Sequence, residues 1–345
     1  MYYLTENPHG GSGLSLDFSA NTNPLGPPPG ALTAARAALE HMDRYPDPHC
    51  RALTRAIAAH EGVPEDRVLC GNGAAELIYS YCAALKPRRA AELAPTFSEY
   101  SAALALHGGT MLRCFLPPET DFLPDAGLPD FLRETKPEAL FLCNPNNPTG
   151  RLIPSALLDE ILALCGRLDI RLFVDECFLA LAGGRSLRDA LAENPHLLIL
   201  NAFTKTYGMA GLRLGWCLSA DRELLAAMAK QTPPWNVSSV AQAAGTAALA
   251  EEGYLPRARA LIEAERPRLA AELSALGLRV RASDANFLLL QGPEPLGAAL
   301  RARGSALRDC SNFPGLGAGW YRCAVRSAEE NQLLIATIRE VMAWQ

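Results

Sequence analysis

Short apolar runs alternate with helix-forming stretches over residues 67–200. The runs are "RVLC", "AAELA", "EALFLC", "IRLFV" and "HLLIL", and each leads into Gly, Pro, Asn or Asp. Continuous apolar runs of this length are typical of strands buried on both faces, as in parallel sheets whose connections are helices. The pattern therefore predicts an α/β domain with helices on both sides of its sheet.

The pattern changes at both ends of the chain. The first 30 residues are rich in Gly, Pro and Asn, which is typical of an extended arm with turns, and a helix is expected at 31–42. After residue 235 a long helical stretch, expected to bend at Pro256 and Pro267, leads to the short strands "ANFLLLQ" and "WYRCAVRS". We predict an N-terminal arm over 1–30, a large α/β domain over 31–235 and a small α+β domain over 236–345.

Composition narrows the classes of function. The 345 residues include 32 Lys and Arg against 37 Asp and Glu, a net charge of −5, so we expect no nucleic-acid partner and no membrane partner. No apolar run is long enough to span a bilayer, and "MYYLTENPHGG" lacks the features of a signal peptide, which predicts a cytoplasmic protein. The ten cysteines form no C-x-x-C pair, so reduced thiols and no metal site are expected.

Polar residues, an aromatic residue and glycines with a wide choice of backbone conformation come directly after the apolar runs. They include 71–73, Phe97, Asn147, Asp175 and Lys205. Open α/β sheets bind their ligands at the carboxyl ends of the strands. These residues are therefore expected to meet at one edge of the sheet.

The stretch "NAFTKTYGMAGLRLG" (201–215) places Lys205 at such a strand end. Most lysines are solvated surface residues, but a partly desolvated lysine can lose its proton and attack an aldehyde. Thr204 and Arg213 add a hydroxyl and a cation that suit a phosphate. Asp175 either caps the following helix or faces a pyridinium nitrogen, and the sequence leaves both open.

Two further motifs also allow two interpretations. In "GNGAAELIY", Gly73, Ala74 and Ala75 open a helix whose free backbone N–H groups can hold a phosphate, although such a segment is often only a turn. In "NPNNPTG" (144–150), the Asn-Pro pairs either form a simple turn or let Asn147 donate a hydrogen bond to a cofactor oxygen.

Taken together, "NPNNPTG", "VDECF" and "FTKTYGMAGLRLG" resemble the fold-type-I pyridoxal-phosphate enzymes of the aminotransferase class I/II family. The resemblance covers nearly the whole chain and implies a mostly parallel seven-stranded sheet in the large domain. It implies that Lys205 bonds to the aldehyde of pyridoxal 5'-phosphate, that Asp175 pairs with the pyridine nitrogen and that Asn147 contacts the ring hydroxyl. The implied ring-stacking and phosphate-binding residues are Phe97, Gly73, Ala74, Ala75, Thr204 and Arg213.

The resemblance further implies a homodimer. Tyr45, in "RYPDP", resembles the tyrosine that reaches the cofactor phosphate of the neighbouring subunit. Two positions depart from the family pattern. Phe178 replaces a frequent tyrosine, which removes one donor to the ring hydroxyl, and Ala202 replaces a Ser or Thr, which shifts phosphate binding onto Thr204 and the backbone.

Other segments concern the substrate. The resemblance places Arg322, in "WYRCAVRS", at the substrate α-carboxylate, where its guanidinium can bind in a bidentate manner. "LDFSANTNPLGPP", "PWNVSSVAQ" and "LRDCSNFPGL" resemble the L-threonine-O-3-phosphate decarboxylases of cobalamin biosynthesis, which are close to histidinol-phosphate aminotransferases. Both groups bind phosphorylated amines, so a second phosphate site is expected. The candidate substrate-binding residues are His9, Asn21, Asn147, Arg308 and Arg322.

The resemblance favours decarboxylation of O-phospho-L-threonine to (R)-1-aminopropan-2-yl phosphate and CO₂. The residues alone leave open a histidinol-phosphate aminotransferase or a phosphoserine decarboxylase giving ethanolamine phosphate, because the bond that breaks depends on its orientation to the cofactor ring. The intact lysine, aspartate and arginine set disfavours a non-catalytic binding protein. "GLGAGW" (315–320) precedes a predicted strand rather than a helix, which disfavours a nicotinamide-binding fold.

Overall fold

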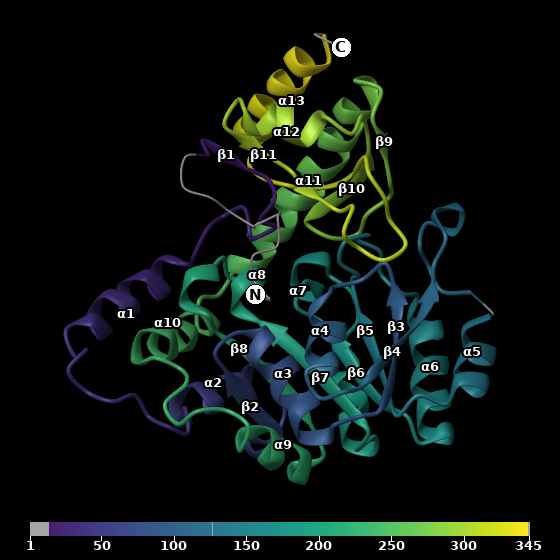
Figure 1. Ribbon diagram of the computed structural model, residues 1–345. Helices are drawn as coiled ribbons and strands as arrows, with labels where there is room; N and C mark the ends of the chain where they lie inside the picture. The colour runs from purple at the N-terminus through teal and green to yellow at the C-terminus, as the bar shows by residue number, and fades with distance from the viewer. Residues whose placement is uncertain (1–13, 126, 344–345) are drawn as a thin grey trace.

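The computed structural model describes residues 14–125 and 127–343. A large α/β domain carries the main sheet, and a smaller domain with its own sheet lies beyond one end of the strands (Figure 1). The α/β architecture predicted from the alternation of apolar runs and helices is confirmed.

The large sheet has seven strands in the order β2-β8-β7-β6-β5-β3-β4. Strand β8 is antiparallel to its neighbours β2 and β7, whereas all other adjacent pairs are parallel. The strands are β2 (Val68–Gly71), β3 (Arg89–Ala94), β4 (Thr110–Phe115), β5 (Ala139–Cys143), β6 (Arg171–Asp175), β7 (Leu197–Ala202) and β8 (Gly215–Ser219). A mostly parallel sheet of this kind places the ends of β5, β6 and β7 side by side.

Strand β4 was not predicted from the sequence. It is an edge strand that is half-buried along most of its length, so its residues form no continuous apolar run. Arg113 interrupts the run and forms an ion pair of 2.8 Å with Glu92 of the neighbouring strand β3. Edge strands bury less apolar surface than central strands and therefore carry a weaker hydrophobic signal.

Side chains alternate between the two faces of the sheet. On one face Phe141, Phe173 and Leu198 pack with three helices, and on the other Leu140, Leu172 and Ile199 pack with a second set. The first set is α3 (Ala74–Leu85), α4 (Glu99–Ala105) and α9 (Arg222–Ala229). The second set is α2 (Arg51–Glu61), α5 (Gly127–Thr135), α6 (Ser155–Leu168) and α10 (Ser239–Leu249). Burial on both faces explains the continuous apolar runs.

The small domain is built on an antiparallel sheet of order β12-β13-β10-β9. Its strands are β9 (Arg279–Val280), β10 (Phe287–Gln291), β12 (Arg308–Asp309) and β13 (Trp320–Ala324), with helices α12 (Leu296–Arg301) and α13 (Ala328–Ala343). The N-terminal arm joins this domain, because β1 (Leu16–Asp17) pairs with β11 (Ser305–Ala306) and Phe18 is buried in its core (Figure 1).

The long C-terminal helical stretch, for which bends at Pro256 and Pro267 were predicted, is interrupted before Pro256. Helix α10 ends at Leu249, Gly253 adopts a φ of +76°, and α11 (Tyr254–Ala275) follows. Pro256 lies in the first turn of α11, where its missing N–H has no helical acceptor, so only Pro267 is inside the helix.

Helix α10 packs against α1 (Pro29–Leu39) and α2. The predicted start of α1 at residue 31 is two residues late, because Pro29 suits the first helical position. Ala241 and Ala244 of α10 belong to the core of the large domain, whereas Leu269 and Leu273 of α11 belong to that of the small domain. We therefore propose that the domain boundary lies within α11 rather than at residue 235.

Short elements complete the described chain. They are the helices α7 (Leu179–Ala182) and α8 (Phe203–Thr206) and the 3-10 turns at Glu65–Arg67, Pro118–Thr120, Arg188–Glu193 and Ala210–Leu212. Within 14–125 and 127–343, no helix combines the length and apolar character needed to cross a bilayer. Nor do His, Cys, Asp and Glu side chains of this part gather into a metal-binding group of three or more.

Candidate active site

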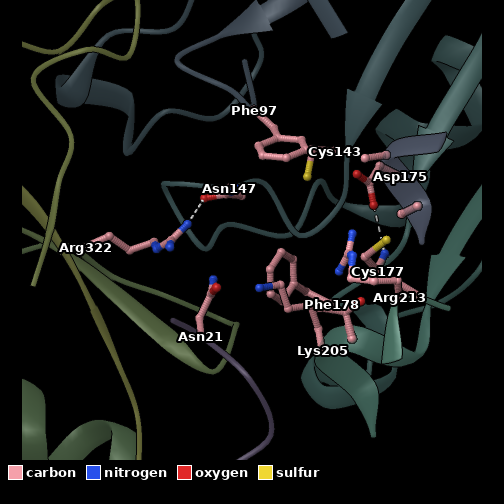
Figure 2. A pocket seen from close by; sticks show the side chains of 14 residues that line it. Asn21, Phe97, Cys143, Asn147, Asp175, Cys177, Phe178, Lys205, Arg213 and Arg322 are labelled. Carbon is pink, nitrogen blue, oxygen red and sulfur yellow. Dashed lines mark hydrogen bonds between the residues drawn. The ribbon is translucent and has the colours of Figure 1, made fainter. Parts of the chain in front are cut away.

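A cavity lies between the carboxyl ends of the central strands and the small domain (Figure 2). Asp175 and Cys143 end two neighbouring strands, Arg322 comes from β13, and Asn21 comes from the N-terminal arm. Most of the candidate residues line this one cavity: Asn21, Ala74, Ala75, Phe97, Asn147, Asp175, Thr204, Lys205, Arg213 and Arg322. The structure thus brings these candidate residues together at one edge of the sheet, as expected from the sequence.

Lys205 is unlike the other lysines of the chain. The sequence contains four, of which Lys86, Lys136 and Lys230 are exposed, whereas Lys205 is half-buried and lines the cavity. It lies on α8, which begins directly after β7. Burial, together with the nearby cations Arg322 and Arg213, lowers the pKa of the Lys205 amine to about 8. A substantial fraction of the amine is therefore neutral and nucleophilic near physiological pH.

Asp175 is a buried carboxylate at the end of β6. Its Oδ1 accepts a hydrogen bond of 3.0 Å from the Cys177 backbone N–H, and its Oδ2 accepts one of 2.6 Å from the Tyr100 hydroxyl. The described part of the chain offers it no ion pair with a basic side chain. Burial raises the pKa of Asp175, although both hydrogen bonds oppose this. The N-cap position of the next helix is Phe178, so Asp175 does not serve as its N-cap.

The start of α3 can hold an anion. Gly73 precedes this 12-residue helix with φ +84° and ψ 161°, a conformation that essentially only glycine adopts, and no side chain caps the helix end. The first backbone N–H groups, on Ala74 and Ala75, have no acceptor within the helix and carry the positive end of its dipole. Thr204 and Arg213 also line the cavity, and the Arg213 guanidinium lies against Gly73. The site therefore suits a phosphate.

Replacing Gly73 with alanine is expected to weaken cofactor binding roughly tenfold, because relief of a backbone strain of about 1–3 kcal/mol would shift the Ala74 and Ala75 N–H groups that face the phosphate. A Cβ at this position would also lie 2.6 Å from the Arg213 Nη2 atom, which would have to move. Gly62→Ala is the matched control, since Gly62 also has a positive φ (+68°) but faces open space. Both variants should lose thermal stability, and only Gly73→Ala should raise the cofactor Kd; equal Kd values would contradict the role of this turn.

The "NPNNPTG" loop is fixed by its other asparagines. Asn144 Oδ1 accepts a hydrogen bond of 2.8 Å from the Ile153 N–H, and Asn146 Nδ2 donates to Pro95 O at 2.9 Å. These bonds leave the Asn147 side chain directed to the cavity, where its Oδ1 accepts a hydrogen bond from Arg322 (Figure 2). The loop is thus more than a simple turn, because it presents one amide at a set place.

Arg322 is a fully buried arginine on β13. Its guanidinium donates to Asn147 Oδ1 and, over 2.8 Å, to the Ser19 carbonyl, and it lies 5.4 Å from the Phe287 ring centroid. No ion pair links it to an acidic side chain among the described residues. Burial lowers the pKa of Arg322 to about 10, so it stays charged at neutral pH. A buried cation held only by neutral groups is suited to an anionic ligand.

Three of the described candidate residues do not line the cavity. Gly73 lies beside it, under the Arg213 guanidinium. Tyr45 is 81% exposed and stacks with Trp235 at 4.8 Å. Arg308 is buried next to Arg322 in the strand register, but its guanidinium donates to Asp309 O and Asn312 Oδ1. His9 lies outside the described residues.

The sequence interpretation missed other residues at the site. Cys143 and Cys177 line the cavity, and Tyr100 contacts Asp175 from behind it. Cys143 pairs with Asp175 in the register of two strands whose pairing no local pattern specifies. Phe178 packs edge-on against Phe287 with centroids 5.0 Å apart, so the departure from tyrosine places an apolar ring in the site.

Comparison with known proteins decides the family. The sequence profile of "Aminotransferase class I and II" matches residues 15–338. The chain belongs to this family. Its members are pyridoxal-phosphate-dependent enzymes, so this family member is one as well.

Individual relatives agree with this assignment. The threonine-phosphate decarboxylase of Salmonella typhimurium is 38% identical over 95% of this chain and 91% of its own length. A histidinol-phosphate aminotransferase of Anaeromyxobacter is 34% identical over 94% and 90%. The solved histidinol-phosphate aminotransferase from Clostridium acetobutylicum superposes on this family member with a TM-score of 0.88 and 26% identity, covering 96% of this chain and 100% of that one.

The cavity fits the cofactor of the family. It offers a buried carboxylate that forms no ion pair with the described basic side chains, a half-buried lysine of lowered pKa and an uncapped helix start facing a cation. These groups match the pyridine nitrogen, the aldehyde and the phosphate of pyridoxal phosphate in charge and chemistry.

Proposed function

We propose that this protein decarboxylates O-phospho-L-threonine to (R)-1-aminopropan-2-yl phosphate and CO₂, a reaction of cobalamin biosynthesis. The observation that carries the proposal is the 38% identity to a threonine-phosphate decarboxylase across 95% of the chain. Two neighbouring buried arginines, Arg308 and Arg322, support it because the substrate carries two anionic groups. Neither arginine forms an ion pair with an acidic side chain in 14–125 or 127–343.

The same proposal assigns the cofactor contacts. Lys205 would bond to the cofactor aldehyde, Asp175 would face the pyridine nitrogen, Asn147 would contact the ring hydroxyl and Phe97 would cover the ring. The phosphate would be held by Gly73, Ala74, Ala75, Thr204 and Arg213. The cofactor supplies an electron-withdrawing ring that stabilises negative charge at the substrate Cα.

The remaining residues act on the substrate. Arg322 binds the α-carboxylate, and Asn147, which already contacts Arg322, helps to orient it. Asn21 and Arg308 serve the substrate phosphate, together with His9, which stays a prediction. After the carboxylate has left as CO₂, Lys205 in its protonated ammonium form would deliver a proton to Cα, for which a pKa of about 8 is well matched.

We also propose a homodimer in which Tyr45 reaches the cofactor phosphate of the neighbouring subunit. Tyr45 is too exposed to act within its own cavity. Leu32, Leu39 and Met42, which precede it in the chain, are also exposed, as is Trp235, whose ring centroid lies 4.8 Å from that of Tyr45. An apolar surface of this kind is typical of a subunit interface.

The proposal is tested by incubating the purified protein with phosphothreonine, phosphoserine and histidinol phosphate in parallel. CO₂ and a phosphorylated amino alcohol are expected from phosphothreonine. Phosphoserine lacks one methyl group, which is worth about 1–3 kcal/mol in a pocket, so it should react roughly 10–200-fold less efficiently. Glutamate formation from 2-oxoglutarate and histidinol phosphate, without CO₂, would contradict decarboxylation.

A histidinol-phosphate aminotransferase is the second candidate. Several relatives at 33–35% identity carry that name, and the same buried arginines and lysine would serve transamination. The two reactions differ in which bond at Cα is perpendicular to the cofactor ring. The product assay separates them directly.

A further inference from the structure

A buried tyrosine contacts the Asp175 carboxylate from outside the cavity. Tyr100 lies on α4, and its hydroxyl donates a hydrogen bond of 2.6 Å to Asp175 Oδ2. Both side chains are buried, but only Asp175 is among the described residues that line the cavity. We propose that Tyr100 is a positioning residue that keeps Asp175 ionised and oriented toward the cofactor nitrogen.

Asp175 needs such support because it is a buried anion that forms no ion pair with a basic side chain in the described part of the chain, and the charge of Lys205 lowers its pKa less than the two hydrogen bonds do. Burial raises its pKa, whereas the hydrogen bonds from Cys177 and Tyr100 lower it. Donors to a carboxylate favour its ionised form. The ionised form is also the one that keeps a proton on a pyridine nitrogen, so the Tyr100 hydroxyl favours the state in which the cofactor is bound.

The aromatic neighbours of Tyr100 hold its hydroxyl in place. Its ring stacks on Phe141 with centroids 5.3 Å apart and an interplanar angle of 14°. It meets Phe97 edge-on at 5.7 Å and 83°. Phe97 lines the cavity, so one rigid ring supports both the residue expected over the cofactor ring and the residue expected at its nitrogen.

Three other titratable side chains face Asp175. They are Cys143 at the end of β5, Cys177 after β6 and Lys205 on α8. Burial raises the pKa of both thiols, so these stay neutral across the physiological range. Lys205 is present both in the parent protein and in a Tyr100 variant, and the charge of Asp175 is one of the causes that set the pKa of its amine. A change in pH dependence caused by removing the Tyr100 hydroxyl therefore reports on Asp175, either directly or through its effect on Lys205.

The test is the pH dependence of the cofactor Kd, measured by titrating cofactor-free protein with pyridoxal phosphate. For Tyr100→Phe, Kd is expected to rise roughly tenfold at about pH 6 and to return toward the parent value at about pH 8.5, because Asp175 is then ionised without help. No substrate is involved, so the inference rests on the cofactor and not on the proposed reaction. Failure of the decarboxylase assay would leave this result unchanged.

Tyr81→Phe is the matched control. Tyr81 is equally buried and packs on the same aromatic residues, Phe141 and Phe173, but its hydroxyl has no hydrogen-bond partner in the described structure. This variant should keep the parent Kd at every pH. An unchanged Kd in Tyr100→Phe, or an equal rise at every pH, would overturn the proposal.

A second measurement does not depend on the folding of Tyr100→Phe. Infrared difference spectra between the cofactor-free parent and Asp175→Asn isolate the Asp175 carboxyl group. An ionised carboxylate at neutral pH is expected. A protonated carboxyl group would overturn the proposal, because the Tyr100 hydroxyl would then not be holding an anion.

Discussion

The Lys205→Ala variant is expected to lose turnover by at least about a thousandfold, since it lacks the side chain that we propose bonds to the cofactor and delivers the proton. Lys205 is the lysine that lines the cavity, and the other three of the chain are exposed. None of those can replace it. The measurement is the rate of product formation with saturating cofactor.

A second readout shows the covalent bond directly. Borohydride treatment of the parent protein, followed by digestion and mass spectrometry, should leave the cofactor on the peptide that contains Lys205. Lys205→Ala should retain none, whereas Lys230→Ala, at the exposed end of α9, should behave as the parent. Turnover retained by Lys205→Ala would overturn the assignment of the site.

The Arg322→Lys variant is expected to lower kcat/KM by roughly a hundredfold, or about 3 kcal/mol. A lysine keeps the positive charge but cannot form two parallel hydrogen bonds to a carboxylate. Because the interaction orients the substrate, the loss should appear in kcat as well as in KM. Steady-state kinetics with phosphothreonine measure both.

Arg281→Lys serves as the control for this substitution. Arg281 also lies over an aromatic ring, with its guanidinium carbon 5.6 Å from the Trp320 centroid, but it is not among the described residues that line the cavity. Its replacement should leave kcat/KM near the parent value. Equal losses in both variants would show that Arg322 acts through stacking in the small domain rather than through the substrate.

Much of the large domain could be predicted from local patterns. Strands β5, β6 and β7 are buried on both faces, so each appears in the sequence as an apolar run. The half-exposed edge strand β4 carries no such run and was missed. The interruption at Gly253 was not predicted, and a bend was expected at Pro256 instead, because proline in a first turn and proline inside a helix look alike in a sequence.

Some residues of the candidate active site could likewise be predicted from local patterns, and others could not. Lys205, Asp175 and Asn147 each follow an apolar run, so their position at the sheet edge follows from chain order alone. The contact between Tyr100 and Asp175 spans 75 positions, and that between Arg322 and Asn147 spans 175. No local period connects residues so far apart.

The sequence by itself determined the alternation of strands and helices, and with it the edge where the chemistry gathers, since these depend on short-range periodicity and on residue type. Only the tertiary structure decided which groups meet there. The strand register places Cys143 beside Asp175, the packing of α4 brings Tyr100 to the carboxylate, and the approach of the small domain brings Arg322 to Asn147. These contacts depend on how whole elements pack, because the side chains involved come from segments that are neighbours only after the hydrophobic cores have formed.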